Sequence, residues 1–266
     1  MPHLYNKIKP YVFSVTSGKG GVGKSISTVN IATMLNDMGY KVAVIDVDLG
    51  LANCATLFNQ SVKATLCEWI TNNCSLEDIL QDIDGITLIT GADDPMEVKI
   101  GNELIMDGLD QLIGYLQPTH DFILIDTPAG AGEMTIWALD VAEFGLIILV
   151  DEPSAISDTY RLCKYVLSLD PDYDLGGLVN FAKDEQDARS TIERFNTILN
   201  HFLNKKCKYI GFIPDHPRVK EAVKKQNTLL GIDPNNPIND EIEFVTQNII
   251  SKSKLIGQHN LEYVNQ

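Results

Sequence analysis

A glycine-rich segment between an apolar stretch and an amphipathic stretch has the residue types and spacing that bind a phosphate. Residues 18–25 read GKGGVGKS and satisfy GxxxxGK[ST]. Glycines let the backbone turn with its N–H groups inward, and the helix expected to start near Gly23 adds its positive N-terminal end. Lys24 would reach the β- and γ-phosphates of a nucleotide, and the Ser25 hydroxyl would ligate Mg²⁺. The expected nucleotide contacts are Gly18, Lys19, Gly20, Gly21, Val22, Gly23, Lys24, Ser25 and Ile26.

Three aspartates follow apolar, strand-like segments and would stand near this loop. Residues 41–46 (KVAVID) end in Asp46, and strand alternation places Asp48 on the same side. Residues 121–126 (DFILID) end in Asp126, the pattern of a Walker B strand whose carboxylate holds Mg²⁺ through water. Because the carboxyl ends of parallel strands share one edge of a sheet, we expect these carboxylates beside the glycine-rich loop.

The elements that must position these residues are short apolar segments separated by helix-length patterns. The segments are β-branched and mostly apolar on both faces, which suits parallel strands covered by helices on each side. The alternation predicts an α/β fold, a doubly wound, mostly parallel sheet of about seven strands with helices on both faces. The expected strands are residues 11–16, 41–46, 86–90, 121–126, 145–150, 176–180 and 208–213, and the expected helices are 23–38, 65–72, 104–116, 157–169, 188–203 and 218–226.

No repeat, low-complexity tract or Gly/Ser linker interrupts this alternation, so we expect one domain over residues 1–230. Pro234 and Pro237 then separate a tail, residues 231–266, with a helix candidate at 241–256. Two interpretations of that helix stay open. It packs on its own domain, or its apolar stripe and nearby lysines contact a membrane, an attraction that Glu241 and Glu243 weaken.

Composition narrows the classes of function. The 36 acidic and 21 basic residues leave a net charge of −15, which argues against bulk electrostatic binding of nucleic acid. No apolar run approaches the roughly 20 residues that span a bilayer, and the first ten residues lack the apolar core of a signal peptide, so we expect a cytoplasmic protein. The five cysteines form no CxC or CxxC pair and are expected to be reduced thiols.

The form KGGVGKS carries a second lysine, Lys19, five residues before Lys24, and with DTPAG at 126–130 it resembles the deviant Walker A ATPases of the MinD/ParA family. The resemblance implies an ATP- and Mg²⁺-dependent hydrolase that closes a homodimer around two nucleotides. Lys19 would then reach the partner's ATP, Asp46 would join Ser25 and Asp126 at the metal, and Asp48 would orient the attacking water. The implied catalytic residues are Lys19, Lys24 and Asp48, and the further implied nucleotide contacts are Gly130 at the γ-phosphate and Asn180, Pro214 and Asp215 at the base.

Within that family, DLGLAN at 48–53 and EPSAISDTY at 152–160 look most like the FlhG branch (FleN or YlxH), which sets flagellar number and placement. Ser157 or Asp158 is also a sensible helix N-cap, so the second segment has a structural interpretation too. A MinD-like septum-site regulator and a ParA-like partitioning ATPase are the alternatives. Each implies a protein partner, and peripheral contact with the inner face of the membrane would come through residues 241–256.

Overall fold

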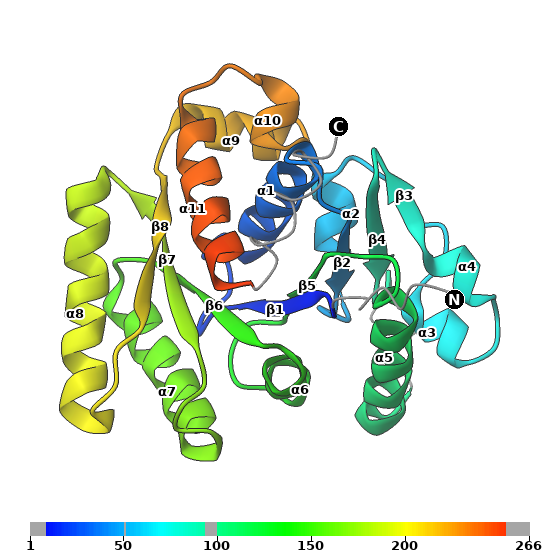
Figure 1. Cartoon of the computed structure of the whole chain (residues 1–266), viewed down its shortest axis with the longest axis horizontal. Helices are drawn as coiled ribbons and strands as arrows, with labels where there is room; N and C mark the ends of the chain where they lie inside the picture. Colours follow the sequence, from blue (N-terminus) through cyan, green and yellow to red (C-terminus); the bar gives the residue numbers. More distant parts are fainter. Residues whose placement is uncertain (1–8, 51, 94–99, 254–266) are drawn as a thin grey trace, which may run out of the picture.

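One mostly parallel sheet of eight strands forms the centre of the protein, in the order β3-β4-β2-β5-β1-β6-β7-β8 (Figure 1). The computed structural model describes residues 9–50, 52–93 and 100–253. All neighbouring strands are parallel except β3, which is antiparallel to β4. The strands are β1 Tyr11–Thr16, β2 Val42–Asp46, β3 Gln81–Ile83, β4 Ile86–Thr90, β5 Phe122–Asp126, β6 Phe144–Leu149, β7 Leu175–Ala182 and β8 Lys208–Pro214. The doubly wound fold is confirmed.

The eighth strand is β3, which the count of about seven strands did not include. It has three residues and pairs with β4 so that Ile83 lies opposite Ile86. The two residues between them, Asp84 and Gly85, both have positive φ (50° and 93°). An Asp-Gly pair of this kind is a strong signal for a two-residue hairpin, and the sequence therefore contained the information.

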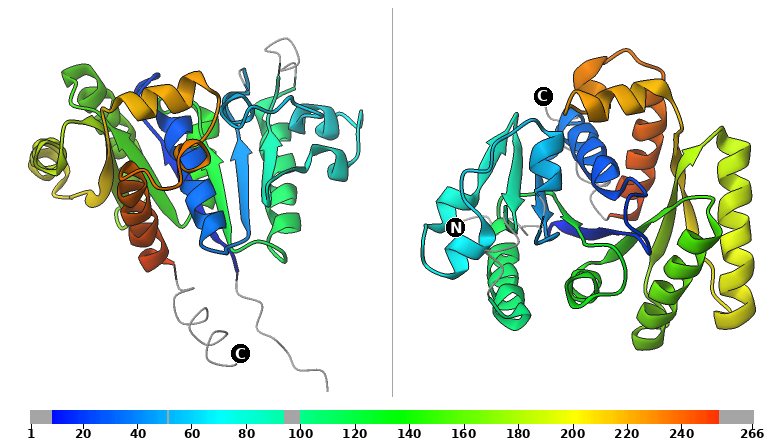
Figure 2. Two further views of the ribbon diagram at one scale, coloured as in Figure 1. Left: turned by 90° about the horizontal axis from the view of Figure 1, so that it is seen from above. Right: turned by 180° about the vertical axis from the view of Figure 1, so that it is seen from behind.

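Helices cover both faces of the sheet (Figures 1 and 2). Helices α1, α2 and α11 lie on one face with α9 and α10 beyond them, and α5, α6, α7 and α8 lie on the other. The helices are α1 Lys24–Asp37, α2 Asn53–Leu57, α3 Leu66–Ile70, α4 Leu76–Ile79, α5 Asn102–Leu116, α6 Glu133–Val141, α7 Pro153–Leu169, α8 Glu185–Leu203, α9 Pro217–Lys224, α10 Leu229–Ile232 and α11 Ile238–Lys252.

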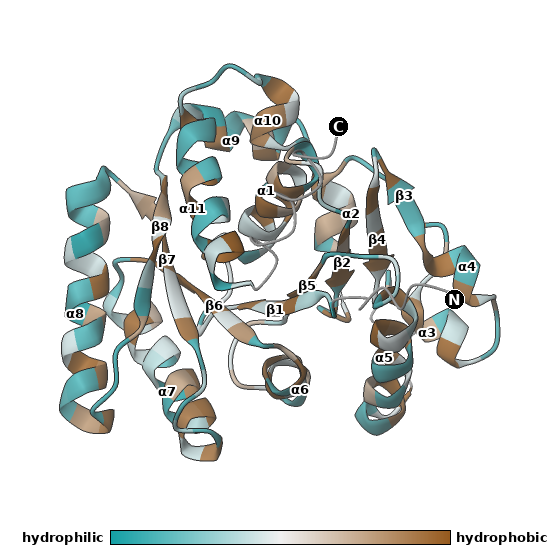
Figure 3. Cartoon of the chain, viewed as in Figure 1, coloured by the Kyte–Doolittle hydropathy of each residue, from teal (hydrophilic) through white to brown (hydrophobic). Residues whose placement is uncertain are grey.

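The central strands are buried on both faces, as the apolar runs predicted. In β5, Phe122 and Leu124 face α1, while Ile123 and Ile125 face α5 and α6. Successive side chains of a strand point to opposite faces, so one short apolar run contributes to two layers of the core. Apolar colour accordingly concentrates on the strands in Figure 3, whereas the outer surface of α8 is mostly hydrophilic.

Helix α7 begins earlier than the sequence analysis placed it. Glu152 is the N-cap and Pro153 the first helical residue, so Ser157 and Asp158 lie inside the helix and cap nothing. Proline suits this first position because its fixed φ is helical and its missing N–H would have had no intrahelical partner.

Helix α11, which lies in the segment expected to form a tail, packs against α1 and β8. Its side chains Ile242, Val245 and Ile249 are buried in the same core as α1. At its end, the Lys252 ammonium donates to an Asp174 carboxylate oxygen at 2.6 Å and lies 4.3 Å from the centre of the Phe144 ring. The candidate at 241–256 thus uses its apolar side within the fold up to Lys252, and Ile256 lies outside the described residues. Within residues 9–50, 52–93 and 100–253, no helix combines the length and apolar character needed to cross a bilayer.

This packing predicts that Ile249→Ala destabilises the protein. Ile249 is fully buried, so the truncation should lower the free energy of unfolding by about 2–5 kcal/mol through lost burial and a cavity. Leu169→Ala is the matched control, because Leu169 is 66% exposed and should cost less than about 1 kcal/mol. Urea denaturation of both variants measures the difference, and equal midpoints would show that α11 is not part of the folded core.

Candidate functional site

The glycine-rich loop connects the carboxyl end of β1 to the first residue of α1, Lys24. Gly21 and Gly23 have φ of 76° and 89°, values that a side chain disfavours. Gly23 is the N-cap of α1, and no side chain caps this end of the helix among the described residues. The first N–H groups of α1 therefore face the loop, where they would donate hydrogen bonds to a bound anion.

Two elements that are distant in the sequence, α7 and β7, pack against the glycine-rich loop. A Cβ on Gly18 would lie 2.1 Å from the Thr159 backbone nitrogen of α7, and one on Gly23 would lie 2.0 Å from the Asn180 side-chain nitrogen of β7. The Asn180 amide also donates to the Val22 carbonyl at 2.7 Å. Asn180, expected at the base of the nucleotide, is thus buried and supports the glycine-rich loop.

The Asp126 carboxylate at the end of β5 gathers three side chains from α1. It accepts hydrogen bonds from Ser25 Oγ at 2.5 Å and Thr28 Oγ1 at 2.9 Å, and its Oδ1 lies 3.3 Å from the Lys24 ammonium. Burial opposes the charge on Lys24, but the carboxylates of Asp126 and Asp46 raise its pKa above the ordinary value. Lys24 therefore stays charged although it is buried.

Asp46 stands directly beside Asp126, because β2 and β5 pair in register at these two residues. Its oxygens accept the backbone N–H groups of Asp48 at 3.1 Å and Cys54 at 3.0 Å. Burial and the adjacent Asp126 charge nevertheless raise the pKa of Asp46 to about 7. The Asp46 carboxyl therefore favours holding a proton.

The donor set at this point fits Mg²⁺. Potential ligand atoms of Asp46, Cys54 and Asp126 lie within 4.8 Å of one another, and Ser25 adds a hydroxyl. Mg²⁺ prefers hard oxygen donors, which the two carboxylates and Ser25 supply. The Cys54 thiol is a soft donor, and burial with the nearby aspartates raises its pKa well above the ordinary value. It therefore remains protonated and does not belong to the magnesium ligands.

Asp48 and Gly130 reach the same end of the site from two loops. Asp48 is half-buried, and one of its oxygens accepts from the Asn53 amide at 3.2 Å. The Gly130 N–H donates to the Ser17 carbonyl at 2.8 Å, and its φ of 86° lets the chain turn close to the glycine-rich loop. The loop after β2 and the loop after β5 thus both end beside the expected γ-phosphate position.

The Lys19 side chain contacts the start of α7 in its own chain. Its ammonium lies 2.7 Å from a Glu152 carboxylate oxygen and donates to Ser154 Oγ at 3.3 Å. The side chain is 41% exposed. A lysine in this position can leave its contacts without opening the core.

A cavity of about 540 Å³ lies over the loop, and its far wall comes from α9 and from Phe181. Pro214 and Asp215, expected at the base, are not among its lining residues, but Asp215 forms an ion pair with the lining residue Lys220 at 2.6 Å. Sequence reasoning missed Phe181 and the α9 side chains. The only signal was the i, i+4 spacing of Lys220 and Lys224 after the last strand. The lining residues are Ser17, Lys19, Gly20, Gly21, Gly23, Lys24, Ser25, Ile26, Asp48, Asn53, Leu57, Ala129, Phe181, Val219, Lys220, Val223 and Lys224.

Comparison with known proteins agrees with this geometry. Residues 8–250 match the ParA family model, described as NUBPL iron-transfer P-loop NTPase. The antiactivator FleN of Pseudomonas aeruginosa is 31% identical over 90% of this chain and 86% of its own. The flagellum site-determining protein YlxH of Helicobacter pylori is 31% identical over 93% of this chain and 84% of its own.

The septum site-determining protein MinD of Pyrococcus horikoshii, solved in complex with Mg-ADP, is similar in structure. It superposes with a TM-score of 0.77 at 25% identity, over 93% of this chain and 98% of that chain. The similarity therefore extends over the whole sheet and its helices.

The close contact of Gly18 with α7 predicts that adding one methyl group at this position strongly destabilises the protein. Gly18→Ala should lower the free energy of unfolding of the nucleotide-free protein by about 3 kcal/mol, because the new Cβ meets backbone atoms that must shift. Gly20→Ala is the control from the same loop, since its Cβ would make an ordinary 4.0 Å contact with Ala129. Denaturation midpoints without nucleotide compare the two. A Gly18 variant as stable as the Gly20 variant would contradict the packing of the loop on α7.

The buried aspartate pair predicts a pH dependence of stability. The pKa of Asp46 is about 7 in the folded chain, against about 4 for an unfolded aspartate. Its protonation therefore stabilises the fold fully below about pH 4, and this contribution is lost as the pH rises through about 7. In Mg²⁺- and nucleotide-free buffer, the melting temperature of wild type relative to Asp46→Asn should fall between about pH 5 and 8. Parallel melting curves for the two proteins across this range would refute the assignment.

Proposed function

The chain belongs to the MinD/ParA family of P-loop ATPases, which use ATP with Mg²⁺, and we propose that it works as a molecular switch controlled by ATP. The observation that carries the proposal is the convergence of Lys24, Ser25 and Asp46 on the Asp126 carboxylate at the foot of the glycine-rich loop. When a nucleotide is bound, the Lys24 ammonium would contact phosphate oxygens in place of the Asp126 carboxylate. The N–H groups of the loop would donate to the same phosphates.

The metal site of the proposal consists of Ser25, Asp46 and Asp126. Bound Mg²⁺ would neutralise charge on the phosphate oxygens. The protein residues then perform the remaining tasks. Ser25 already donates to Asp126, so the two side chains are held together before any ligand arrives, and Asp46 is fixed by two backbone N–H groups.

Asp48 is the residue that we assign to orienting the attacking water. Its carboxylate lines the cavity, and the Asn53 amide restrains one of its oxygens. Phosphoryl transfer requires mainly positioning and charge neutralisation, so a restrained carboxylate beside the γ-phosphate is sufficient chemistry. Gly130, which reaches the glycine-rich loop from the other side, would change its position according to whether the γ-phosphate is bound.

Lys19 is the residue that we assign to dimerisation. In the single chain it is held by Glu152 and Ser154 at the start of α7. An exposed ion pair of this kind contributes no more than about 1 kcal/mol, so a triphosphate on a second subunit would compete for it easily. We therefore infer that ATP closes a homodimer in which each Lys19 leaves α7 for the partner's nucleotide, and that hydrolysis reverses the exchange.

The biological output that we propose is spatial regulation of flagella. FleN and YlxH, named as an antiactivator and a flagellum site-determining protein, support it over nearly their whole length. A MinD-like role in septum placement is the second candidate, favoured by the structural similarity to MinD. The net charge of −15 disfavours DNA partitioning. Deleting the gene should change flagellar number in the first case and division-site placement in the second, and microscopy of the mutant distinguishes them.

Membrane contact through residues 241–256 stays part of this proposal in a restricted form. Because Val245 and Ile249 are buried, Phe244, which is 45% exposed, is the large apolar side chain of the described part of this segment that would enter lipid. Leu255 and Ile256 lie outside the described residues. ATP-dependent co-sedimentation with anionic vesicles tests it, and binding that is equal with ADP would contradict a switch.

Three substitutions separate nucleotide binding, dimerisation and hydrolysis. Lys24→Ala should weaken ATP binding at least tenfold, since a buried charge that faces the phosphates is lost. Asp48→Ala should bind ATP and dimerise but hydrolyse roughly a hundredfold more slowly. Lys19→Ala should bind ATP as a monomer. Calorimetry, phosphate release and sedimentation with ATP and ADP measure these properties.

Lys183→Ala is the matched control, because Lys183 is exposed and forms no ion pair among the described residues. It should behave like wild type in every assay. Normal hydrolysis by both Lys24→Ala and Asp48→Ala would show that the site assignment is wrong. An Asp48→Ala protein that remains monomeric with ATP would exclude the proposed switch and leave the nucleotide site intact.

A further inference from the structure

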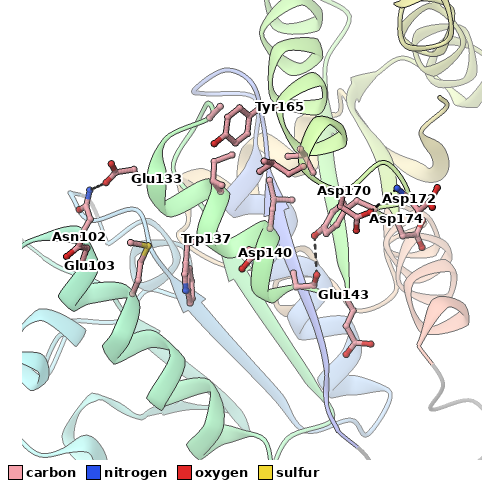
Figure 4. Close-up of a pocket in the computed structure, with 18 of the residues that line it drawn as sticks. Asn102, Glu103, Glu133, Trp137, Asp140, Glu143, Tyr165, Asp170, Asp172 and Asp174 are labelled. Atoms are coloured by element: carbon pink, nitrogen blue, oxygen red, sulfur yellow. Dashed lines mark hydrogen bonds between the residues drawn. The ribbon is translucent and has the colours of Figure 1, made fainter. Parts of the chain in front are cut away.

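A second cavity, of about 1130 Å³, lies on the face of the sheet that α5, α6 and α7 cover (Figure 4). It is an open groove that follows α6, with α5 along one side and α7 along the other. One end is lined by Ala131 and Glu133, just after the loop of Gly130, and the other by Asp174 before β7. None of the residues assigned to the nucleotide site lines it.

The groove has an apolar floor and partly exposed apolar walls. Trp137 and Leu139 of α6 are nearly buried in the floor. On the α7 side, Leu169 is 66% exposed and Tyr165 is 47% exposed, and both side chains line the groove. Large apolar groups that remain exposed around a concave surface are typical of a site for another macromolecule.

The charged side chains around this apolar floor are all acidic among the described residues. No Lys, Arg or His lines the groove in the part of the chain that the structure describes. Two lining aspartates, Asp172 and Asp174, have lysine partners at 2.6–3.5 Å. Five further carboxylates are exposed and form no ion pair among the described residues. These are Glu103, Glu133, Asp140, Glu143 and Asp170.

Hydrogen bonds between α5 and α6 fix the shape of the groove. The Trp137 indole N–H donates to Asp110 of α5 at 3.1 Å, and the Asn102 amide donates to Glu133 at 2.5 Å. A preformed groove lowers the ordering cost of binding.

We propose that this groove binds a basic amphipathic helix of a protein partner. An apolar stripe would lie on Trp137, Tyr165 and Leu169, while lysines and arginines on both sides of the stripe would face the unpaired carboxylates. Helix α6, which the groove follows, has nine residues and is about 14 Å long, enough to lie along about two and a half turns of a bound helix. This inference goes beyond the switch proposed above and does not depend on nucleotide.

Charge complementarity selects this occupant over the others. A second copy of the chain would bring its own net charge of −15 to an acidic groove. The longer chain segments outside the described residues, 1–8, 94–99 and 254–266, contain one lysine each. A cationic helix is therefore the segment that the surface attracts most strongly.

The test uses a labelled helical peptide of about 14 residues, with leucines at i, i+3, i+4 and i+7 and lysines elsewhere, and a scrambled peptide of the same composition. Fluorescence anisotropy measures binding to wild type, to Asp140→Lys/Glu143→Lys and to Tyr165→Ser/Leu169→Ser. Each groove variant should weaken binding of the helical peptide about tenfold or more. The control Asp37→Lys/Glu193→Lys makes the same charge change at exposed, unpaired carboxylates elsewhere, and should weaken it less than about threefold.

Three outcomes would overturn the proposal. Equal weakening by the control variant, or equal binding of the scrambled peptide, would mean general charge attraction. A concentration-dependent dimer that the Tyr165→Ser/Leu169→Ser variant abolishes would assign the groove to a second copy. Peptide binding that tightens about tenfold when residues 1–8 or 254–266 are deleted would assign it to the chain itself. ATP binding by the same variants checks independently that they are folded.

Discussion

Two carboxylates buried side by side at adjacent strand ends determine how the nucleotide end of this protein is built. A buried charge is costly unless it is paired or protonated, and Asp46 and Asp126 meet that demand differently. Asp126 is paired with Lys24 and accepts from Ser25 and Thr28, whereas Asp46 uses two backbone N–H groups and a raised pKa. The groups expected to bind phosphate and metal therefore have partners within the protein, and a bound nucleotide would have to replace these contacts rather than add to them.

Most of the sheet and the central part of the site were predictable because their signals are local. Eight consecutive residues, 18–25, are enough to specify the glycine-rich loop, and the apolar runs before Asp46 and Asp126 mark the ends of two strands. Parallel pairing of these strands then places the two aspartates next to each other. The Asp84-Gly85 hairpin was equally local but was missed, because three-residue β3 offers no alternation long enough to detect. Pro153 is the local signal for the true start of α7, because proline is favoured at the first helical position, four residues before Ser157.

The rest of the site depends on tertiary placement that no local pattern contains. Lys220 and Lys224 line the cavity over the glycine-rich loop only because α9 folds back over that loop. Asn180 was expected at the base, and the tertiary contact of its amide with the Val22 carbonyl could not be read from the sequence. Helix α6 was not predicted at all, since it packs between α5, α7 and the sheet and lacks a clear polar side.

Helix α7 extends from one functional surface of the molecule to the other. Its first turns contact the glycine-rich loop through Glu152, Ser154 and Thr159, and its last turn carries Tyr165 and Leu169. Its 17 residues form a rod about 26 Å long. An α-helix of this length is a single rigid element, so the contacts of its first turns with the glycine-rich loop and the exposed side chains near its end keep a fixed spacing.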